Sequence, residues 1–295
     1  MSWSCPRALT AAALLGLATV AVASAPQRVV TLAPHLTELV YAAGAGRALV
    51  GTVAFSDYPA AARGLPRVGD ANRIDRERLL SLKPDLIILW TDGTSPEEQA
   101  QIRALGVPVL SLEAVRLEDV ARLIEELGRR FGTESIANPA AGEFRTRISA
   151  LRRQYAGAAR LRVFYQVWDA PLYTLGGRHV ISEILGLCSA DNVFGELQRG
   201  AFVVDLESVY ARDPDVIVLA GSAEEAGAWR KAWLERPRLR AASDGTLLAL
   251  DPDLVDRMGP RMAAGAAQLC AGLDRLRGTL SPPAPGRIGD NGAPP

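Results

Sequence analysis

The sequence is poor in the side chains on which most catalytic and metal sites depend. Its 295 residues include only two histidines and three cysteines. The motifs GxSxG, HExxH and GxGxxG and the phosphate-binding P-loop are all missing from it. The formal net charge is zero, and no basic patch stands out. These absences argue against an enzyme, against a resident cofactor and against a nucleic-acid partner.

The N-terminus carries an uncharged, apolar run over residues 8–23, with Arg7 in front of it and small residues at its end. This pattern is typical of a secretory signal peptide, with cleavage expected after Ala23. The run is short for a membrane span, so an uncleaved anchor is the less favoured alternative. Lipid attachment is disfavoured because Cys5 precedes the apolar run instead of following it. We therefore expect export to the periplasm.

Removal of the signal peptide leaves two cysteines, Cys188 and Cys270. An even number of cysteines in an exported and therefore oxidising setting predicts a disulfide bond between them. The alternative is two separately buried thiols, since free cysteine packs as a small apolar residue.

One segment of the chain occurs twice without a gap. Residues 74–89, IDRERLLSLKPDLIIL, recur 130 residues later as VDLESVYARDPDVIVL, residues 204–219. Each copy is typical of a helix that begins after an aspartate cap, stops before a Pro-Asp turn and leads into a buried strand. The repeat predicts two similar lobes with a ligand cleft at the carboxyl ends of their strands. The alternative to a duplication is that a helix, a Pro-Asp turn and a strand form a combination that is common in α/β folds.

Strands and helices alternate along the rest of the chain, which predicts mainly parallel sheets. A helix between the lobes is indicated by apolar residues at helical spacing, with Pro139 in its first turn. Such a stiff connection predicts small opening motions. The expected division is a signal peptide over residues 1–23, an N-terminal lobe over 27–135, a linker helix over 136–158, a C-terminal lobe over 159–278 and a disordered tail over 279–295.

Residues that differ between the two copies are the candidates for binding a ligand that lacks two-fold symmetry. Trp90 stands where the second copy has Ala220, and Phe202 stands where the first has Asn72. Two further aromatic residues lie in loops expected at the same cleft. Together they predict a large, flat and partly apolar ligand, with core packing as the alternative for each. The four are Phe55, Trp90, Tyr173 and Phe202.

A polar loop between the last predicted strand and the last predicted helix should open toward the same cleft. It consists of Asp253, Leu254, Val255, Asp256 and Arg257. The arginine could hold a phosphate or an amide carbonyl of a ligand. A surface ion pair between Asp253 and Arg257 is the alternative without a function.

Three other side chains carry weaker predictions. Glu77 and Glu207 occupy matching places in the repeat, so they could meet a partner with two-fold symmetry, such as a homodimeric membrane permease. Alternatively, they only complement the dipoles of the helices on which they lie. His35 could act as an axial ligand to a metal, but it lacks a neighbouring Cys or His pattern, and no metal site is predicted.

Several motifs together resemble the periplasmic cobalamin (vitamin B12) binding proteins of ABC importers. They are RVVTLAPHLTEL, FSDYP, LKPDLIILW, QVWDAPLYTLGG, LCSADNVF and LDPDLVDRMGPR, and the resemblance extends over residues 27–277. SDYP and LKPDLII are also similar to heme and ferric-siderophore receptors of the same superfamily. Residues 165–194 are the part that resembles the cobalamin receptors in particular.

The resemblance implies a class III periplasmic binding protein with two Rossmann-like lobes, a rigid linking helix and a corrinoid held between the lobes. It implies that the four aromatic residues and residues 253–257 contact the ligand, and that Glu77 and Glu207 dock onto permease arginines. It also implies a monomer without a cofactor of its own and a disulfide between Cys188 and Cys270. Heme, with His35 as axial ligand, and ferric siderophores are the alternative ligands. The chain departs from the family at Ala71, where members can have an aromatic residue.

Overall fold

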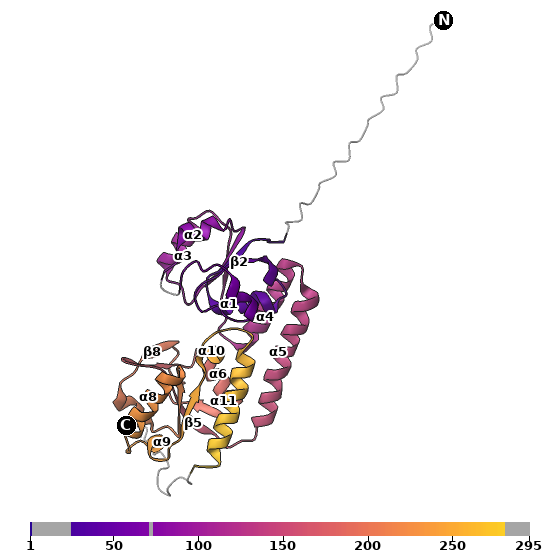
Figure 1. Cartoon of the computed structure of the whole chain (residues 1–295). Helices are drawn as coiled ribbons and strands as arrows, with labels where there is room; N and C mark the ends of the chain where they lie inside the picture. Colours follow the sequence, from indigo (N-terminus) through magenta and orange to yellow (C-terminus); the bar gives the residue numbers. More distant parts are fainter. Residues whose placement is uncertain (2–24, 71–72, 281–295) are drawn as a thin grey trace.

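The computed structural model describes residue 1, residues 25–70 and residues 73–280. Two α/β lobes are arranged end to end, and one long helix runs along the side of both (Figure 1). This arrangement confirms the predicted fold class. Residues 2–23 of the predicted signal peptide, Ala71, Asn72 and residues 281–295 of the predicted tail fall outside the described residues.

The N-terminal lobe is built on a parallel sheet with strand order β2-β1-β3-β4. Its strands are β1 (Val29–Thr31), β2 (Leu49–Gly51), β3 (Leu86–Trp90) and β4 (Val109–Leu112). Its helices are α1 (Pro34–Ala42), α2 (Arg76–Ser81), α3 (Pro96–Arg103) and α4 (Leu117–Phe131), with short 3-10 turns η1 (Gly46–Ala48) and η2 (Ala60–Gly64). α1 and α4 pack on one face of the sheet, and α2 and α3 pack on the other. Helices on both faces explain why every residue of β1 and every residue of β3 except Trp90 is buried.

The C-terminal lobe contains a mixed sheet with strand order β10-β9-β5-β6-β8, and β7 pairs with β5. Its strands are β5 (Leu161–Asp169), β6 (Leu172–Leu175), β7 (Ala190–Asn192), β8 (Ala201–Val203), β9 (Val216–Ala220) and β10 (Leu247–Leu250). Its helices are α6 (Val180–Leu187), α7 (Leu206–Arg212), α8 (Ala223–Leu234), α9 (Arg240–Ser243), α10 (Pro252–Val255) and α11 (Met262–Arg277).

Part of this second sheet differs from the sequence prediction. The alternation of strands and helices predicts mainly parallel pairing, but β5 continues to Asp169 and turns back as the antiparallel strand β6. β8 then adds a second antiparallel pair to β6. The hairpin was missed because Ala170 and Pro171, which separate the two strands, are not the Asn-Gly, Asp-Gly or other glycine-containing pair that marks a two-residue hairpin turn.

The sequence repeat is confirmed as a structural repeat, and its shared acids have shared tasks. The side chains of Asp75 and Asp205 accept hydrogen bonds from the backbone at the starts of α2 and α7. The second shared acid of each copy lies before a central strand. Asp85 accepts from the backbone N–H of Arg28 at 3.1 Å, and Asp215 accepts from that of Arg162 at 2.7 Å. Each Pro-Asp turn therefore ties the strand that follows it to the beginning of its neighbour.

The helix that joins the lobes is α5 (Glu134–Tyr155), which packs against α4 and α11 (Figure 1). The apolar residues that predicted it, Phe144, Ile148, Leu151 and Tyr155, are all buried. The sequence predicts Pro139 in the first turn of this helix. That prediction is wrong, because the helix already begins at Glu134. Proline in the second turn leaves the carbonyl of Ser135 without its helical donor.

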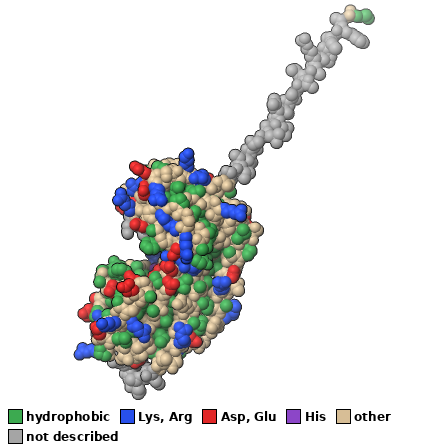
Figure 2. Space-filling view, viewed as in Figure 1, with side chains coloured by type: hydrophobic (Ala, Val, Ile, Leu, Met, Phe, Trp, Pro, Cys, Tyr) green, Lys and Arg blue, Asp and Glu red, His purple; other side chains and the backbone are tan. Residues whose placement is uncertain are grey.

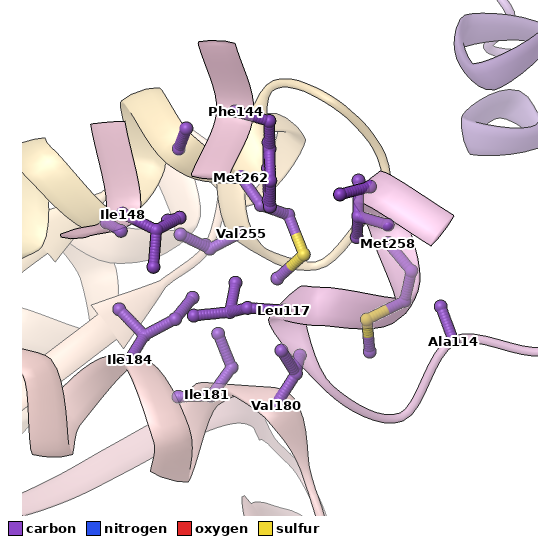
Figure 3. Packing of buried hydrophobic residues seen from close by; sticks show 14 of the residues in the cluster. Ala114, Leu117, Phe144, Ile148, Val180, Ile181, Ile184, Val255, Met258 and Met262 are labelled. Carbon is purple, nitrogen blue, oxygen red and sulfur yellow. The ribbon is translucent and has the colours of Figure 1, made fainter. Parts of the chain in front are cut away.

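A continuous hydrophobic core connects the two lobes beside α5. Leu117 at the start of α4 packs with Ile181 and Ile184 of α6 and with Val255 and Met262 near α11 (Figure 3). Burial of apolar surface in both lobes by the same cluster resists separation of the lobes. The core therefore supports the expectation of small opening motions.

The predicted disulfide is confirmed, since Cys188 at the end of α6 is bonded to Cys270 in α11. Both cysteines are fully buried. Among residues 25–70 and 73–280, no helix is both long and apolar enough to cross a membrane.

Candidate functional site

The first cavity, which we call the N-lobe cavity, lies at the carboxyl ends of β1 and β3. Its walls come from the turn before α1, the loop after β2, the segment after β3 and α3, and Asp256 and Arg257 close it from the C-terminal lobe. It contains about 790 Å³ of space, including its open mouth. This is the edge at which open α/β sheets bind ligands.

A second cavity, which we call the interlobe cavity, is lined by both lobes. Asp92 and Val115 line it from the N-terminal lobe, and His179, Ala201 and Met258 line it from the C-terminal lobe. Trp90 lines both cavities, so the two adjoin along its side chain. Figure 2 shows the notch between the lobes, with acidic and basic side chains gathered where the lobes meet.

Trp90 is the predicted ligand contact that the structure places most centrally. Its ring meets the ring of His35 edge to face, with 4.8 Å between the ring centroids. Burial, together with the nearby charge of Arg257, lowers the pKa of His35 to about 3. The imidazole is therefore neutral at ordinary pH. Among the described residues, no group of three or more His, Cys, Asp or Glu side chains could hold a metal ion.

Phe55, the second predicted aromatic contact, also lines the N-lobe cavity. Its side chain is 74% exposed, and its backbone has a φ of 62°, in the left-handed region. A bulky residue in this region is strained, and such strain is concentrated at binding sites. A large exposed ring at the mouth of a cavity is available to contact a ligand.

Tyr173 and Phe202, the other two predicted aromatic contacts, are not among the residues that line either cavity. The strand pairing puts them on opposite faces of the hairpin, because Tyr173 is opposite Val203 whereas Phe202 is opposite Thr174. The ring of Phe202 packs against Phe194 in the C-lobe core, with centroids 5.9 Å apart. The expected convergence of four aromatic side chains on one cavity is therefore seen for two of them.

Tyr173 nevertheless lies near the interlobe cavity. It is on the same face of the hairpin as Ala201, which lines that cavity. Trp168 pairs with Tyr173, and both Trp168 and Val203 are about half exposed. The sequence analysis missed these two neighbours because it had not recognised the hairpin, whose pairing alone would have indicated them. Contact of Tyr173 with a ligand remains a prediction.

The predicted polar loop is divided between core and cavity. Asp256 and Arg257 line the N-lobe cavity, but Val255 is fully buried in the core and Leu254 packs against that core. Residues 252–255 form the short helix α10, which turns these apolar side chains inward. The ion pair between Asp253 and Arg257 exists, at 2.7 Å. It does not exclude a role for Arg257, which also faces the cavity.

Arg257 belongs to a group of charges that joins the two lobes, and we call this group the interlobe clasp. It consists of Glu38 and Asp57 from the N-terminal lobe and of Arg257 and Arg261 from the C-terminal lobe. Arg257 lies 3.1 Å from Asp57. Arg261 donates two hydrogen bonds to Glu38, at 2.7 and 3.0 Å, and lies 4.6 Å over the ring of Tyr58. Sequence analysis did not identify this clasp.

Glu38 is the most enclosed member of the clasp, with 3% of its surface exposed. Burial raises its pKa, although the hydrogen bond and charge of Arg261 act in the opposite direction. A carboxylate in this position needs its arginine partner in order to remain ionised at low cost.

Asp256 is a second buried acid at the cavity. Burial raises its pKa to about 7, although the hydroxyl of Tyr165 donates a hydrogen bond to it at 3.2 Å. A large share of Asp256 side chains is therefore protonated at neutral pH and can donate a hydrogen bond to a ligand.

We expect Asp256→Asn to change the pH dependence of stability. The pKa of about 7 in the folded protein lies above the ordinary value of 3.8. The stability that the protonated acid contributes is therefore present below pH 4 and lost as the pH rises through 7. The variant should lack this loss and should melt at least about 3 °C above the wild type at pH 8. Parallel melting profiles of the two proteins between pH 4 and pH 8 would contradict the assignment.

Glu77 and Glu207 lie in the first turns of α2 and α7, where the repeat predicts them. Both are exposed. Within the described residues, neither takes part in an ion pair. Both carboxylates are thus available to another protein.

Comparison with known proteins agrees with this geometry. The profile of the periplasmic binding protein family matches residues 29–254. A vitamin B12-binding protein of Vibrio cholerae is 36% identical over 247 residues, which cover 84% of this chain and 89% of that protein. The crystal structure of the periplasmic vitamin B12-binding protein BtuF of Vibrio cholerae has a TM-score of 0.78 at 36% identity and covers 85% of this chain and 98% of its own.

A similar protein with another ligand is also known. The crystal structure of a periplasmic heme-binding protein from Pseudomonas aeruginosa has a TM-score of 0.74 at 31% identity. The match covers 83% of this chain and 92% of that one. Similar folds thus serve both ligand classes.

Proposed function

This chain belongs to the periplasmic binding protein family, and we propose that it captures cobalamin or a related corrinoid between its lobes and delivers it to the permease of an ABC importer. The observation that carries the proposal is the pair of adjoining cavities that share Trp90. The names of the similar proteins from Vibrio cholerae support the choice of ligand. The protein would act in the periplasm as a monomer, after cleavage of its signal peptide.

The proposed binding needs no chemical step. Burial of the corrinoid face against Trp90 and Phe55 would supply several kcal/mol, and polar groups at the rim would fix its orientation. The core shared by the lobes would keep the two walls of the site in place with little movement. Pre-organisation of this kind lowers the entropic cost of binding.

Calorimetric titration of the mature protein with cyanocobalamin tests the proposal. We expect one binding site with a dissociation constant in the nanomolar range, about −12 kcal/mol. The visible band of the corrinoid should shift on binding. Absence of both heat and a spectral change would contradict the proposal.

Heme is the second candidate ligand. It is favoured by the similar heme-binding protein from Pseudomonas aeruginosa and by the neutral imidazole of His35 at the cavity. A Soret shift on addition of hemin that His35→Ala abolishes would support heme in place of a corrinoid.

Delivery to the permease can be tested at the two exposed acids of the repeat. We expect Glu77→Lys together with Glu207→Lys to reduce corrinoid uptake at least about tenfold. Each reversal would place a lysine against an arginine of the permease, and like charges at a contact repel. Affinity for cyanocobalamin should stay the same. Uptake of labelled cyanocobalamin and calorimetry measure the two effects.

The matched control for this test is Glu97→Lys together with Glu224→Lys. These are exposed acids in the first turns of α3 and α8, outside the repeat. They should leave uptake unchanged. Equal uptake by both double variants would remove the proposed docking role.

A further inference from the structure

Three buried polar atoms without a hydrogen-bond partner belong to residues that line the N-lobe cavity. They are Nε2 of His35, Nε1 of Trp90 and Oε1 of Glu98. In the described part of the chain the only other such atom is Nε of Arg240, in the opposite lobe. Native proteins pair almost all of their buried polar groups, because an unpaired group costs about 1–3 kcal/mol. They are concentrated in residues of one cavity, where a bound polar group would supply the missing hydrogen bonds.

The three atoms define what kind of group would bind. The indole nitrogen of Trp90 can only donate a hydrogen bond. The other oxygen of Glu98 lies 3.3 Å from Arg76, so one carboxyl oxygen is left to accept a hydrogen bond. The neutral ring of His35 can donate or accept at Nε2. A group that both accepts and donates, such as a primary amide, complements this set.

The surrounding charges disfavour a carboxylate at the same place. It would approach the free oxygen of Glu98, and like charges repel at short range. Arg257, the buried cation at this cavity, is already paired with Asp57 and Asp253. The exposed Arg73 shares the rim of the cavity with Asp70, which has the opposite charge.

We propose that His35, Trp90 and Glu98 form an amide subsite, which accepts an uncharged carboxamide arm of the corrinoid and discriminates against the same arm as a carboxylate. The carbonyl would accept from Trp90, and the amide nitrogen would donate to Glu98. This proposal rests on the proposed function and adds the part of the ligand that is recognised. Corrinoids carry several carboxamide arms, whereas the side arms of heme end in carboxylates.

Binding of cyanocobalamin and of its monocarboxylic acids tests the subsite. In each of these acids one peripheral amide has been hydrolysed. We expect at least one acid to bind the wild-type protein about tenfold more weakly than cyanocobalamin at pH 7.5, since a hydrogen bond is replaced by repulsion. Glu98→Gln should bring the two affinities to within about twofold, and Trp90→Phe should weaken cyanocobalamin binding about fivefold.

Trp233→Phe is the matched control. It removes an indole N–H that donates to Gln166 in the core of the other lobe, at 2.6 Å. It should change neither the affinity nor the preference for the amide. The comparison of ligands on the wild-type protein needs no variant, so a variant that fails to fold does not block the test.

The outcomes separate the two proposals. Suppose that cyanocobalamin binds tightly but that the affinity of each acid is the same for the wild-type protein and for Glu98→Gln. The amide subsite is then wrong, and the proposed function stands. If no corrinoid binds, both are wrong. Weaker binding of one acid that Glu98→Gln corrects supports both.

Discussion

Arg261→Met should lower the free energy of unfolding by about 3–5 kcal/mol, which is the usual cost of removing one partner from a buried ion pair. Arg261 gives Glu38 two hydrogen bonds, and Glu38 is almost fully enclosed. Without Arg261 its nearest cation would be Arg257, at 3.9 Å and already shared with two other acids. Urea unfolding at pH 7 measures the change.

The loss should depend on pH in a definite direction. Burial raises the pKa of Glu38, and removal of Arg261 takes away the hydrogen bond and the charge that oppose this rise most, which leaves only the charge of Arg257 to oppose it. Stability that depends on protonated Glu38 is fully present below its unfolded pKa and is lost as the pH rises through its folded pKa. The variant should therefore lose most stability at high pH and recover part of it near pH 4.

Two comparisons control this experiment. Arg275→Met makes the same chemical change at an exposed position of α11 and should alter stability by less than about 0.5 kcal/mol. Glu38→Gln combined with Arg261→Met removes both charges and should regain most of the loss. If Arg261→Met is as stable as Arg275→Met, the clasp does not hold the lobes together.

Removal of the disulfide should have a similarly large effect. Cys188 and Cys270 are 82 residues apart, and release of a loop of this length from the unfolded chain costs about 4 kcal/mol of stability. For a protein of this size, Cys188→Ala with Cys270→Ala should melt about 8–16 °C lower than the wild type. Thermal unfolding followed by circular dichroism measures the shift.

A reducing agent provides the control for the disulfide experiment. It should lower the melting temperature of the wild type toward that of the double variant and leave the variant unchanged. Equal melting temperatures of the oxidised wild type and the variant would show that the bond contributes no stability.

The sequence predicted those features that depend on local chemistry. The aspartate caps at Asp75 and Asp205 and the Pro-Asp turns at Asp85 and Asp215 each act within their own supersecondary unit. For that reason the duplicated unit and the two lobes could be recognised from residue order. The disulfide also followed from the number of cysteines and the export signal.

The features that the sequence missed depend on strand pairing and on distant contacts. The orientation of Phe202 toward the core follows from its register with β6, which residue order does not reveal. Glu38 and Arg261 are 223 residues apart, and only the assembled lobes bring them together. Val255 sits in a segment that looks like a polar loop but forms a short helix with an apolar inner side.

Native mass spectrometry of the protein isolated from its own periplasm tests the central claim most directly. We expect one protein chain to carry one corrinoid of unaltered mass, released intact on unfolding. A heme, a ferric siderophore or a chemically altered corrinoid as the retained ligand would contradict the account.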